Sequence, residues 1–269
     1  METLQTGRFY GQTSQTLQFD FATITDTEYT HDRVDWHYHE NAYFTFILQG
    51  NVIEGNRKEV YNCSAGSLLF HNWHDAHYNI KPKGYTRGFH VELHEHWFKN
   101  TGLNFSNLQG SFAVADPKSH LLFYNLFRES KGRDGMSSAP IEALLLQALA
   151  DISAPEKYKV KQKPLWAEKL KQVLHDDISQ KFTLQQLAEI ADVHPVHLSR
   201  DFPKYFNTNF GDYVRALRIE KAFTLMHDTK LSLTEIALSC GFADQSHFLR
   251  CFKQFNNCKP SLYRQLLFS

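Results

Sequence analysis

The chain has 269 residues and a mass of 31.3 kDa, which favours two domains over one small domain. With 42% hydrophobic, 22% charged and 14% aromatic residues, its composition excludes a disordered, collagen-like or coiled-coil protein. The formal net charge is zero, but 17 Lys and Arg oppose 12 Asp and Glu from Glu156 onward, whereas residues 1–155 carry 12 against 17. The sequence therefore predicts an acidic first half and a basic second half.

The cellular compartment is predicted from what the sequence lacks. Residues 1–6 carry neither the basic nor the apolar region of a signal peptide, and no stretch reaches the roughly 18 apolar residues of a membrane span. The four cysteines form no CxxC pair, so buried free thiols are expected. We therefore predict a cytoplasmic protein without a membrane partner.

The segment from Phe19 to Leu93 is rich in β-branched and aromatic residues, and turn residues divide it into short runs. The clearest runs are Tyr43–Leu48, Gly66–Phe70 and Gly88–Leu93. Because no helical pattern separates them, a small barrel or sandwich is favoured over a parallel sheet. This predicts an N-terminal β-barrel whose mouth can hold one ligand.

Histidines are concentrated in this segment, since ten of the fifteen precede residue 156. His37 and His39 point to the same face of a strand because the side-chain period is two, and His77 is the natural third ligand of a facial metal site. Alternatively, the histidines line a pocket for an organic molecule, with aromatic residues that can stack on a sugar or another flat ligand. The residues of this predicted effector pocket are Trp36, His37, His39, Tyr43, Trp73 and His77.

The same residues carry a resemblance to the cupins. His37-x-His39-x3-Tyr43-x6-Gly50 is similar to the first cupin motif, and Gly66 with His77 eleven residues later is similar to the second. However, Tyr43 stands where metal-binding cupins usually place a glutamate ligand, and three neutral ligands would hold a divalent cation less tightly. We therefore predict an effector pocket without a metal or other cofactor, and keep a metal site at His37, His39 and His77 as the alternative.

Two amphipathic helices are predicted after the strands, from Lys118 to Ser130 and from Pro140 to Ile152. They either pack on the barrel or form the face of a dimer. The lysine-rich segment Asp151–Lys163 has the composition of a solvated linker. The expected organisation is a cupin-like domain of residues 1–155, a linker of residues 156–163 and a second domain of residues 164–269, the basic half of the chain.

The second half contains an internal repeat. From Phe202 and from Phe252, an aromatic residue, an asparagine and a tyrosine follow at the same intervals of three, five and eleven residues. Each unit begins at an N-cap residue, Thr183 or Ser232, and a tight turn joins its two short helices. This layout predicts two helix-turn-helix motifs, at residues 183–206 and 232–256.

The second helix of each motif has an outward face that can contact DNA. Phe202 points inward in the first motif, which leaves Arg200 and Lys204 on the outer face. The second motif likewise leaves Arg250 and Lys253 on its outer face, with Arg250 at the position that matches Arg200. An arginine there can bind guanine O6 and N7, whereas a lysine more often contacts a phosphate.

Residues from Leu165 to Leu267 match a known domain pattern. The matching residues are Gly211-x-Tyr213-x4-Leu217-Arg218-Ile219-x2-Ala222, then Ile236-Ala237-x3-Gly241-Phe242-x2-Gln245-Ser246-x-Phe248-x-Arg250-x-Phe252-Lys253-x6-Pro260-x2-Tyr263-Arg264. They closely resemble the DNA-binding domain of AraC/XylS-type transcriptional regulators, a family that commonly carries a cupin-like N-terminal domain. The resemblance implies that a helix around Tyr213–Met226 joins two motifs whose recognition helices enter successive major-groove segments, about 34 Å apart.

The resemblance also assigns DNA contacts by position. The matched base-reading positions are Val196, Ser199, Arg200, Gln245, Ser246 and Arg250. Lys204 and Lys253 are predicted to contact phosphates. Two departures from the family pattern are Pro203, which removes an amide donor where a basic residue is usual, and the asparagines Asn207 and Asn257, which replace a helix-ending glycine.

We therefore predict a sequence-specific transcriptional regulator in which a small-molecule effector shifts the protein between two arrangements. The expected partners are double-stranded DNA, an effector such as a sugar or another small metabolite, RNA polymerase and a second copy of the chain. Activation is the more common outcome in the family. No catalysis is required.

Two alternatives use different chemistry. The first is a metal-dependent cupin enzyme fused to a DNA-binding module, with His37, His39 and His77 as ligands. The second is an alkylation-response protein with a methyl-accepting cysteine. Against the second, the three cysteines of the repeat have the apolar neighbours of packing residues and no basic histidine or metal pattern beside them; they are Cys240, Cys251 and Cys258.

Overall fold

The computed structural model describes residues 1–73, 75–102, 108, 110–132, 138–153, 164–206 and 208–268. The chain folds into two compact units, Met1–Ala154 and Pro155–Ser269, which we describe separately. The linker predicted at residues 156–163 lies outside the described residues.

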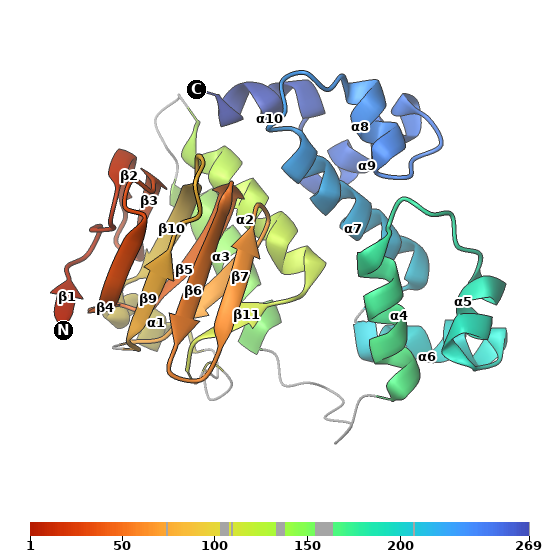
Figure 1. The fold of residues 1–269 in the computed structure, drawn as a ribbon, viewed down its shortest axis with the longest axis horizontal. Helices are drawn as coiled ribbons and strands as arrows, with labels where there is room; N and C mark the ends of the chain where they lie inside the picture. The colour runs from red at the N-terminus through yellow and green to blue at the C-terminus, as the bar shows by residue number, and fades with distance from the viewer. Residues whose placement is uncertain are drawn as a thin grey trace. The chain divides into compact units, whose positions relative to one another are not determined.

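The first unit is built on two β-sheets (Figure 1). One sheet has the order β1-β4-β9-β6-β7 and the other has the order β11-β8-β5-β10-β3-β2. The strands are β1 (Glu2–Leu4), β2 (Gln12–Gln18), β3 (Ala22–Glu28), β4 (Arg33–His39), β5 (Tyr43–Gln49), β6 (Asn51–Asn56), β7 (Val60–Ser64), β8 (Leu68–His71), β9 (His77–Ile80), β10 (Arg87–Leu93) and β11 (Phe112–Val114). The cupin-like fold predicted from the sequence is confirmed.

Three helices belong to this unit: α1 (Glu95–Asn100), α2 (Pro117–Ser130) and α3 (Ser138–Ser153). Alternation along β5 explains how α2 packs. Phe44 contacts Phe123 of α2 with ring centroids 4.9 Å apart, whereas Tyr43 and Thr45 point to the opposite face and line a cavity. One face of the six-stranded sheet is therefore covered by α2, and the other carries polar side chains.

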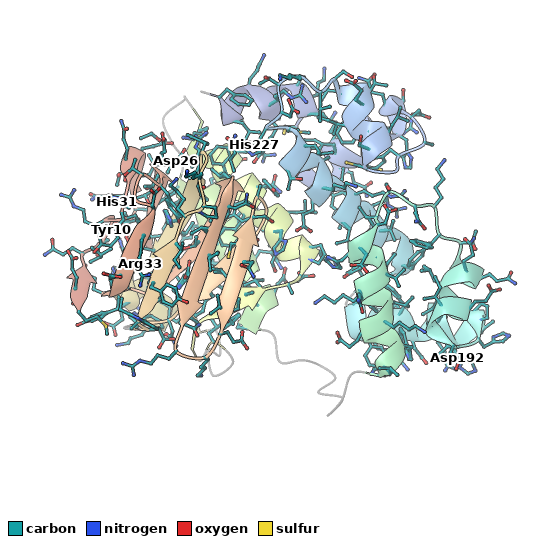
Figure 2. All side chains as sticks on the ribbon, viewed as in Figure 1. Tyr10, Asp26, His31, Arg33, Asp192 and His227 are labelled. Atoms are coloured by element: carbon teal, nitrogen blue, oxygen red, sulfur yellow. The ribbon has the colours of Figure 1, made fainter. Side chains whose placement is uncertain are left out.

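A buried ion cluster ties α2 to the sheet. Asp26 on β3 accepts hydrogen bonds of 2.7 Å from Arg87 on β10 and of 2.6 Å from Lys131, which follows α2. Burial raises the pKa of Asp26, but Arg87 and then Lys131 outweigh it, so the pKa lies below its usual value. Asp26 is labelled in Figure 2. Its carboxylate therefore holds two cations that are distant in sequence.

Three strands, β1, β2 and β11, lie outside the range expected from the sequence, and both ends of α3 differ from the expected ones. β1 and β2 precede the expected start at Phe19, because β2 is a mostly exposed run of Gln, Thr and Ser without an apolar alternation. α3 begins at Ser138 and continues to Ser153, so Asp151 is helical and the lysine-rich segment begins later than expected. The strands expected at Tyr43–Leu48 and Gly88–Leu93 are confirmed as β5 and β10.

The second unit is helical. Its helices are α4 (Leu165–Asp176), α5 (Leu184–Ala191), α6 (Pro195–Phe206), α7 (Phe210–Leu225), α8 (Leu233–Ser239), α9 (Gln245–Asn256) and α10 (Pro260–Leu267). α5 and α6 form the first predicted helix-turn-helix motif, and α8 and α9 form the second. α7 joins them, since its Tyr213 packs on Phe202 of α6 and its Phe223 packs on Phe252 of α9.

The first helix of each motif begins with the same type of N-terminal cap. The Thr183 side chain accepts from the Gln186 amide and the Gln186 side chain accepts from the Thr183 amide, which is a capping box. Ser232 and Glu235 form an equivalent capping box at α8. Both N-caps predicted from the sequence are confirmed. Among the helices of the described ranges, none combines the length and the apolar character needed to cross a bilayer.

Candidate functional site

The predicted base-reading residues of the first motif lie on an exposed face of α6. Val196 is 64% exposed, although it is apolar, and Ser199 and Arg200 are also exposed. Leu198 and Phe202 are buried on the opposite face, as the helical period requires. The structure therefore brings these three predicted contacts together on one face of one helix.

The two basic residues of this face, Arg200 and Lys204, both form ion pairs with the side chain of Asp201. Arg200 donates to Asp201 Oδ1 at 3.0 Å and Oδ2 at 3.1 Å, and Lys204 Nζ lies 2.9 Å from Asp201 Oδ1. Hydrogen bonds from Arg200 and then from Lys204 hold the pKa of Asp201 well below its usual range. A second Arg200 nitrogen lies 2.9 Å from His197 Nδ1. Arg200 must therefore leave these partners before it can bind a base.

The second motif presents its predicted contacts differently. Ser246 and Arg250 are exposed on α9, as is Lys253 one turn further along. Among the described residues, no ion pair involves the Arg250 or Lys253 side chain. Gln245 is half-buried, and its side-chain oxygen accepts from Thr234 of α8 at 3.0 Å. The basic groups of this face are thus available to a polyanion.

The turns of the two motifs also differ. Asp192 ends α5 in the left-handed conformation with a φ of 56°, and Figure 2 labels it at the α5–α6 turn. In the second motif this conformation is adopted by Gly241, with a φ of 82°. A Cβ atom on Gly241 would lie 2.5 Å from the Ser179 carbonyl oxygen, so the glycine is also needed for close packing. Asn257 ends α9 with a φ of 53°, while Asn207 lies outside the described residues.

Helix α6 continues through Pro203, which the sequence had marked as a departure from the family pattern. Pro203 is exposed, so the proline replaces an amide donor on the solvent side of the helix. The sequence pattern also places Tyr205 on the inward face with Leu198 and Phe202. Tyr205 is only half-buried, whereas the next residue, Phe206, is buried with its ring stacked 4.1 Å from Phe202.

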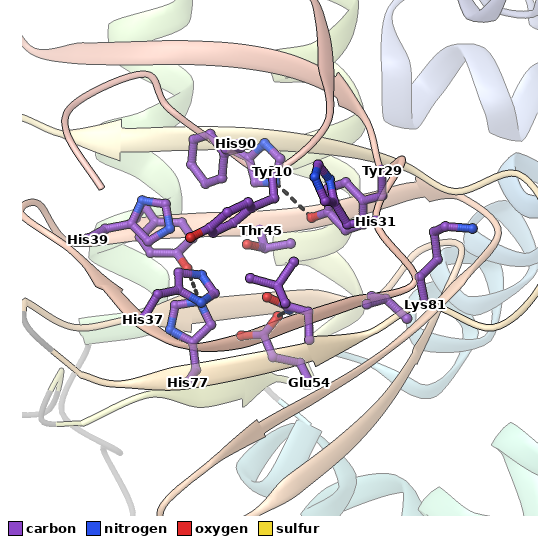
Figure 3. A pocket seen from close by; sticks show the side chains of 15 residues that line it. Tyr10, Tyr29, His31, His37, His39, Thr45, Glu54, His77, Lys81 and His90 are labelled. Atoms are coloured by element: carbon purple, nitrogen blue, oxygen red, sulfur yellow. Dashed lines mark hydrogen bonds between the residues drawn. The ribbon is translucent and has the colours of Figure 1, made fainter. Parts of the chain in front are cut away.

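A small cavity lies within the first unit, where β4, β6, β9 and β10 bring polar side chains together (Figure 3). Its volume is about 30 Å³, which is room for about one water molecule. The lining residues are Phe9, Tyr10, Tyr29, His31, Val34, His37, His39, Tyr43, Thr45, Val52, Glu54, His77, Asn79, Lys81 and His90. Four of the six residues of the predicted effector pocket are among them.

The other two predicted pocket residues lie elsewhere. Trp36 is 39% exposed and packs on Tyr78, because adjacent residues of a strand point to opposite faces and His37 takes the inner one. Trp73 packs on Phe98 of α1, with ring centroids 4.9 Å apart. The structure therefore does not bring these tryptophans to the cavity.

Three histidines converge at the cavity, as the strand alternation predicts. A ring nitrogen of each of His37, His39 and His77 lies within 4.8 Å of the others, and all three side chains are buried. His37 Nδ1 donates to the Asp35 carbonyl at 2.9 Å, and His77 Nδ1 donates to the Asp75 carbonyl at 3.2 Å. These bonds leave the Nε2 atoms of both rings for other partners. The Tyr43 hydroxyl donates to His77 Nε2 at 2.9 Å.

Sequence reasoning missed the acidic residues of this region. Glu54 on β6 is 3% exposed, and its Oε1 lies 3.0 Å from His71 Nε2. Glu92 on β10 is completely buried, and its Oε1 lies 3.9 Å from His39 Nδ1. Neither strand carries a motif for these positions. The only signal is the side-chain period of two, which places Glu54 on the same strand face as Val52 and Glu92 on the same strand face as His90.

Burial sets the protonation of these groups. It lowers the pKa of His77 to about 3 and of His39 well below its usual value, and in both cases neighbouring imidazoles add to the effect. Burial alone would raise the pKa of Glu54, but the adjacent His71 outweighs it and lowers the value to about 2. At neutral pH, His39 and His77 are therefore neutral imidazoles, and Glu54 is an ionised carboxylate beside His71.

The cysteines of the repeat are buried, like Cys63 in the first unit. Burial raises the pKa of Cys240 to about 12 and also raises that of Cys251. Because the thiolate is the nucleophile, these side chains are poorly suited to accept a methyl group.

Two family models match the chain. A model described as "AraC-like ligand binding domain" matches residues 18–150, and one described as "Helix-turn-helix domain" matches residues 187–266. The first covers the strands from β3 to β11, α1, α2 and most of α3, and the second covers α6 to α9 with most of α5 and α10.

Curated relatives are similar mainly over the second unit. The "Uncharacterized HTH-type transcriptional regulator YobQ" of Bacillus subtilis is 31% identical over 96 residues, which is 36% of this chain and 40% of YobQ. The "Bifunctional transcriptional activator/DNA repair enzyme AdaA" of the same organism is 26% identical over 101 residues, or 38% of this chain and 48% of AdaA. The match thus spans less than half the length of these relatives.

A relative from Salmonella schwarzengrund, the "HTH-type transcriptional activator RhaR", is 21% identical over 271 residues, which is 91% of each chain. Among solved structures, ToxT from Vibrio cholerae is 13% identical over 90% of this chain and 98% of ToxT, with a TM-score of 0.38.

Proposed function

Because the chain belongs to the AraC/XylS family of transcriptional regulators, we propose that it binds a specific DNA site through α6 and α9 and that a ligand in the first unit controls this binding. One observation carries the DNA-binding part. Two capped helix-turn-helix motifs in one compact unit each expose an arginine at the matching position of their second helix and a lysine about one turn further along.

The proposed division of labour follows from side-chain chemistry. Arg250 and Arg200 can form two parallel hydrogen bonds with a guanine, and Gln245 can pair with an adenine after leaving Thr234. Val196 can contact a thymine methyl group, while Ser199 and Ser246 can bond to several base edges. Lys204 and Lys253 are proposed to contact phosphates, which would position the helices without reading sequence.

Regulation is proposed to originate in the first unit. A ligand changes an equilibrium only if it binds one arrangement more tightly than another. We propose that its site lies in the first unit, the part of the chain that the ligand-binding family model matches. We further propose that the protein works in the cytoplasm as a homodimer and contacts RNA polymerase.

The test is a selection of genomic DNA fragments by the purified full chain, with and without added metabolite pools. We expect a site composed of two motifs about one helical turn apart, whose affinity one pool changes. Binding that is blind to sequence and is lost with salt would contradict the proposal.

A charge-matched control separates recognition from bulk electrostatics. Arg250→Ala removes a positive charge from the proposed DNA face, whereas Arg33→Ala removes one from an exposed residue of β4 in the first unit. We expect the first variant to lose specific affinity and the second to bind like the parent. Equal losses in both variants would show that net charge, and not α9, determines binding.

A further inference from the structure

Of the three histidines at the cavity, His39 has a buried ring nitrogen whose hydrogen bonding is not satisfied within the described residues. Within the described part of the chain, His39 Nδ1 is buried without a hydrogen-bond partner, and so is Glu92 Oε1, which lies 3.9 Å away. The other oxygen of Glu92 accepts from the Gly7 amide, so this carboxylate is held in place and aimed at the imidazole. Buried polar atoms usually have partners, so this pair requires an explanation.

Metal coordination provides that explanation. A histidine that binds a metal through one ring nitrogen usually donates the other N–H to a carboxylate or a backbone carbonyl. His37 and His77 already donate Nδ1–H to the Asp35 and Asp75 carbonyls. If His39 bound a metal through Nε2, its Nδ1–H would face Glu92, and both unpartnered atoms would be satisfied.

The space and the charge fit an ion better than an organic molecule. A cavity of about 30 Å³ holds about one water molecule and is far smaller than the roughly 300–1,000 Å³ of typical organic-ligand pockets. The buried Glu54 carboxylate lies in a second group with His71 and His77, whose ligand atoms are also within 4.8 Å of one another. A cation bound at His77 would therefore sit beside a negative charge in a region with little solvent.

We propose that the first unit binds one divalent first-row transition metal ion through His37, His39 and His77, with Glu92 orienting His39 and Glu54 supplying negative charge beside the site. Imidazole ligands suit Zn²⁺, Fe²⁺, Ni²⁺ and Cu²⁺. The ligand atoms, which lie within 4.8 Å of one another, must be about 3.3 Å apart for a tetrahedral site with bonds of about 2.05 Å. The Tyr43 hydroxyl must release His77 Nε2.

The experiment uses the full chain after treatment with a chelator. Co²⁺ is titrated while visible absorption is recorded, and Zn²⁺ is then added to displace it. We expect one equivalent of Co²⁺ per chain and an intense visible band that Zn²⁺ removes. The absence of saturable binding in the parent would overturn the proposal.

Two variants and one control locate the site. His39→Gln removes a ligand and should weaken Co²⁺ binding more than 100-fold, whereas Glu92→Gln keeps the shape and should weaken it 10- to 100-fold. The control is His90→Gln, because His90 is equally buried but both its ring nitrogens already have partners, Thr25 and Tyr29. It should bind Co²⁺ as the parent does.

Circular dichroism of each variant shows whether it is folded, and Glu92→Gln keeps the test decisive if His39→Gln does not fold. Parent-like affinity in a folded His39→Gln or Glu92→Gln protein would overturn the proposal. No DNA is present in these measurements, so their outcome tests the metal site and does not depend on whether the proposed DNA recognition is correct.

Discussion

The two helix-turn-helix motifs share their outline but differ in how their basic side chains are held. Both begin with a capping box, and both pack a phenylalanine at the same place in the second helix, Phe202 or Phe252. In the first motif Asp201 pairs with Arg200 and Lys204. The residue at the matching position in the second motif is Cys251, which is buried and cannot pair with a cation in this way.

The two motifs therefore have the same backbone framework but differ in the charge of their exposed helix faces. A duplicated framework places both recognition helices, but one acidic residue lowers the positive potential of the first helix and none does so within α9. We therefore infer that the second motif contributes more to binding specificity, and that the first is adjusted by the competition between Asp201 and DNA phosphates. The following predictions test this asymmetry, from the largest expected effect to the smallest.

The turn of the second motif should tolerate substitution least. Gly241→Ala should destabilise the protein by about 2–4 kcal/mol, because φ is positive and the new Cβ atom would collide with the Ser179 backbone. Asp192→Ala, at the turn of the first motif, should cost about 1 kcal/mol. Denaturant unfolding of the full chain measures both.

Gly211→Ala is the control for these turn variants. Gly211 lies in α7, and its nearest neighbour for a new Cβ atom is the flexible end of Arg215, 3.4 Å away. An alanine there should leave stability unchanged or raise it by about 0.5–1 kcal/mol. If Gly241→Ala is no more harmful than this control, the proposed packing of the turn is wrong.

Removing an arginine should affect the two motifs unequally. Arg250→Ala should cost about 1–3 kcal/mol of binding free energy on the selected DNA site and relax one base position. Arg200→Ala should weaken binding less, because Arg200 gives up Asp201 in order to bind DNA. Fluorescence anisotropy on the selected site, at several salt concentrations, measures both. A larger loss for Arg200→Ala would reverse the proposed asymmetry.

The caps should behave alike in both motifs. Thr183→Ala and Ser232→Ala each remove a side-chain acceptor from a capping box and should each destabilise the protein by about 1 kcal/mol. Thermal unfolding of the full chain tests this equality. A negligible loss in one of them would show that the two frameworks are less alike than their hydrogen bonds indicate.

Asp201→Asn should have the smallest effect and the opposite sign. The substitution frees Arg200 and Lys204 from a carboxylate, so DNA affinity should rise a few-fold and the salt dependence should steepen by about one phosphate contact. The matched control is Asp228→Asn, since Asp228 is also acidic and exposed but lies outside both recognition helices. Weaker DNA binding by Asp201→Asn would mean that Asp201 positions Arg200 for recognition.

Local patterns were sufficient for the second unit. Helices form from neighbouring residues, so the Ser232 cap, the left-handed Gly241 and the exposed face of Arg250 are all encoded within a few positions. The interaction of Arg200 with Asp201 is also local, since the two residues are adjacent, but their side chains can meet only in some rotamers. The sequence therefore predicted the helix face but not which cations it leaves unpaired.

The first unit was less predictable, because strands far apart in the sequence form its site. The His37-x-His39 alternation indicated one ligand face, but Trp36 was placed in the same pocket although its neighbouring position sends it outward. Glu54 and Glu92 have no local signal for a shared site. They meet the histidines only through the pairing of β6 and β4 with β9 and the packing of β10 from the other sheet.

The sequence by itself determined the two-part organisation, the duplicated helix-turn-helix motifs and the family, because these depend on periodicity and spacing along the chain. Only the tertiary structure decided that the cavity is small, that it contains buried carboxylates and that His39 faces Glu92. The physical reason is that helix faces follow from local geometry, whereas the surroundings of a buried side chain depend on strand register and sheet packing.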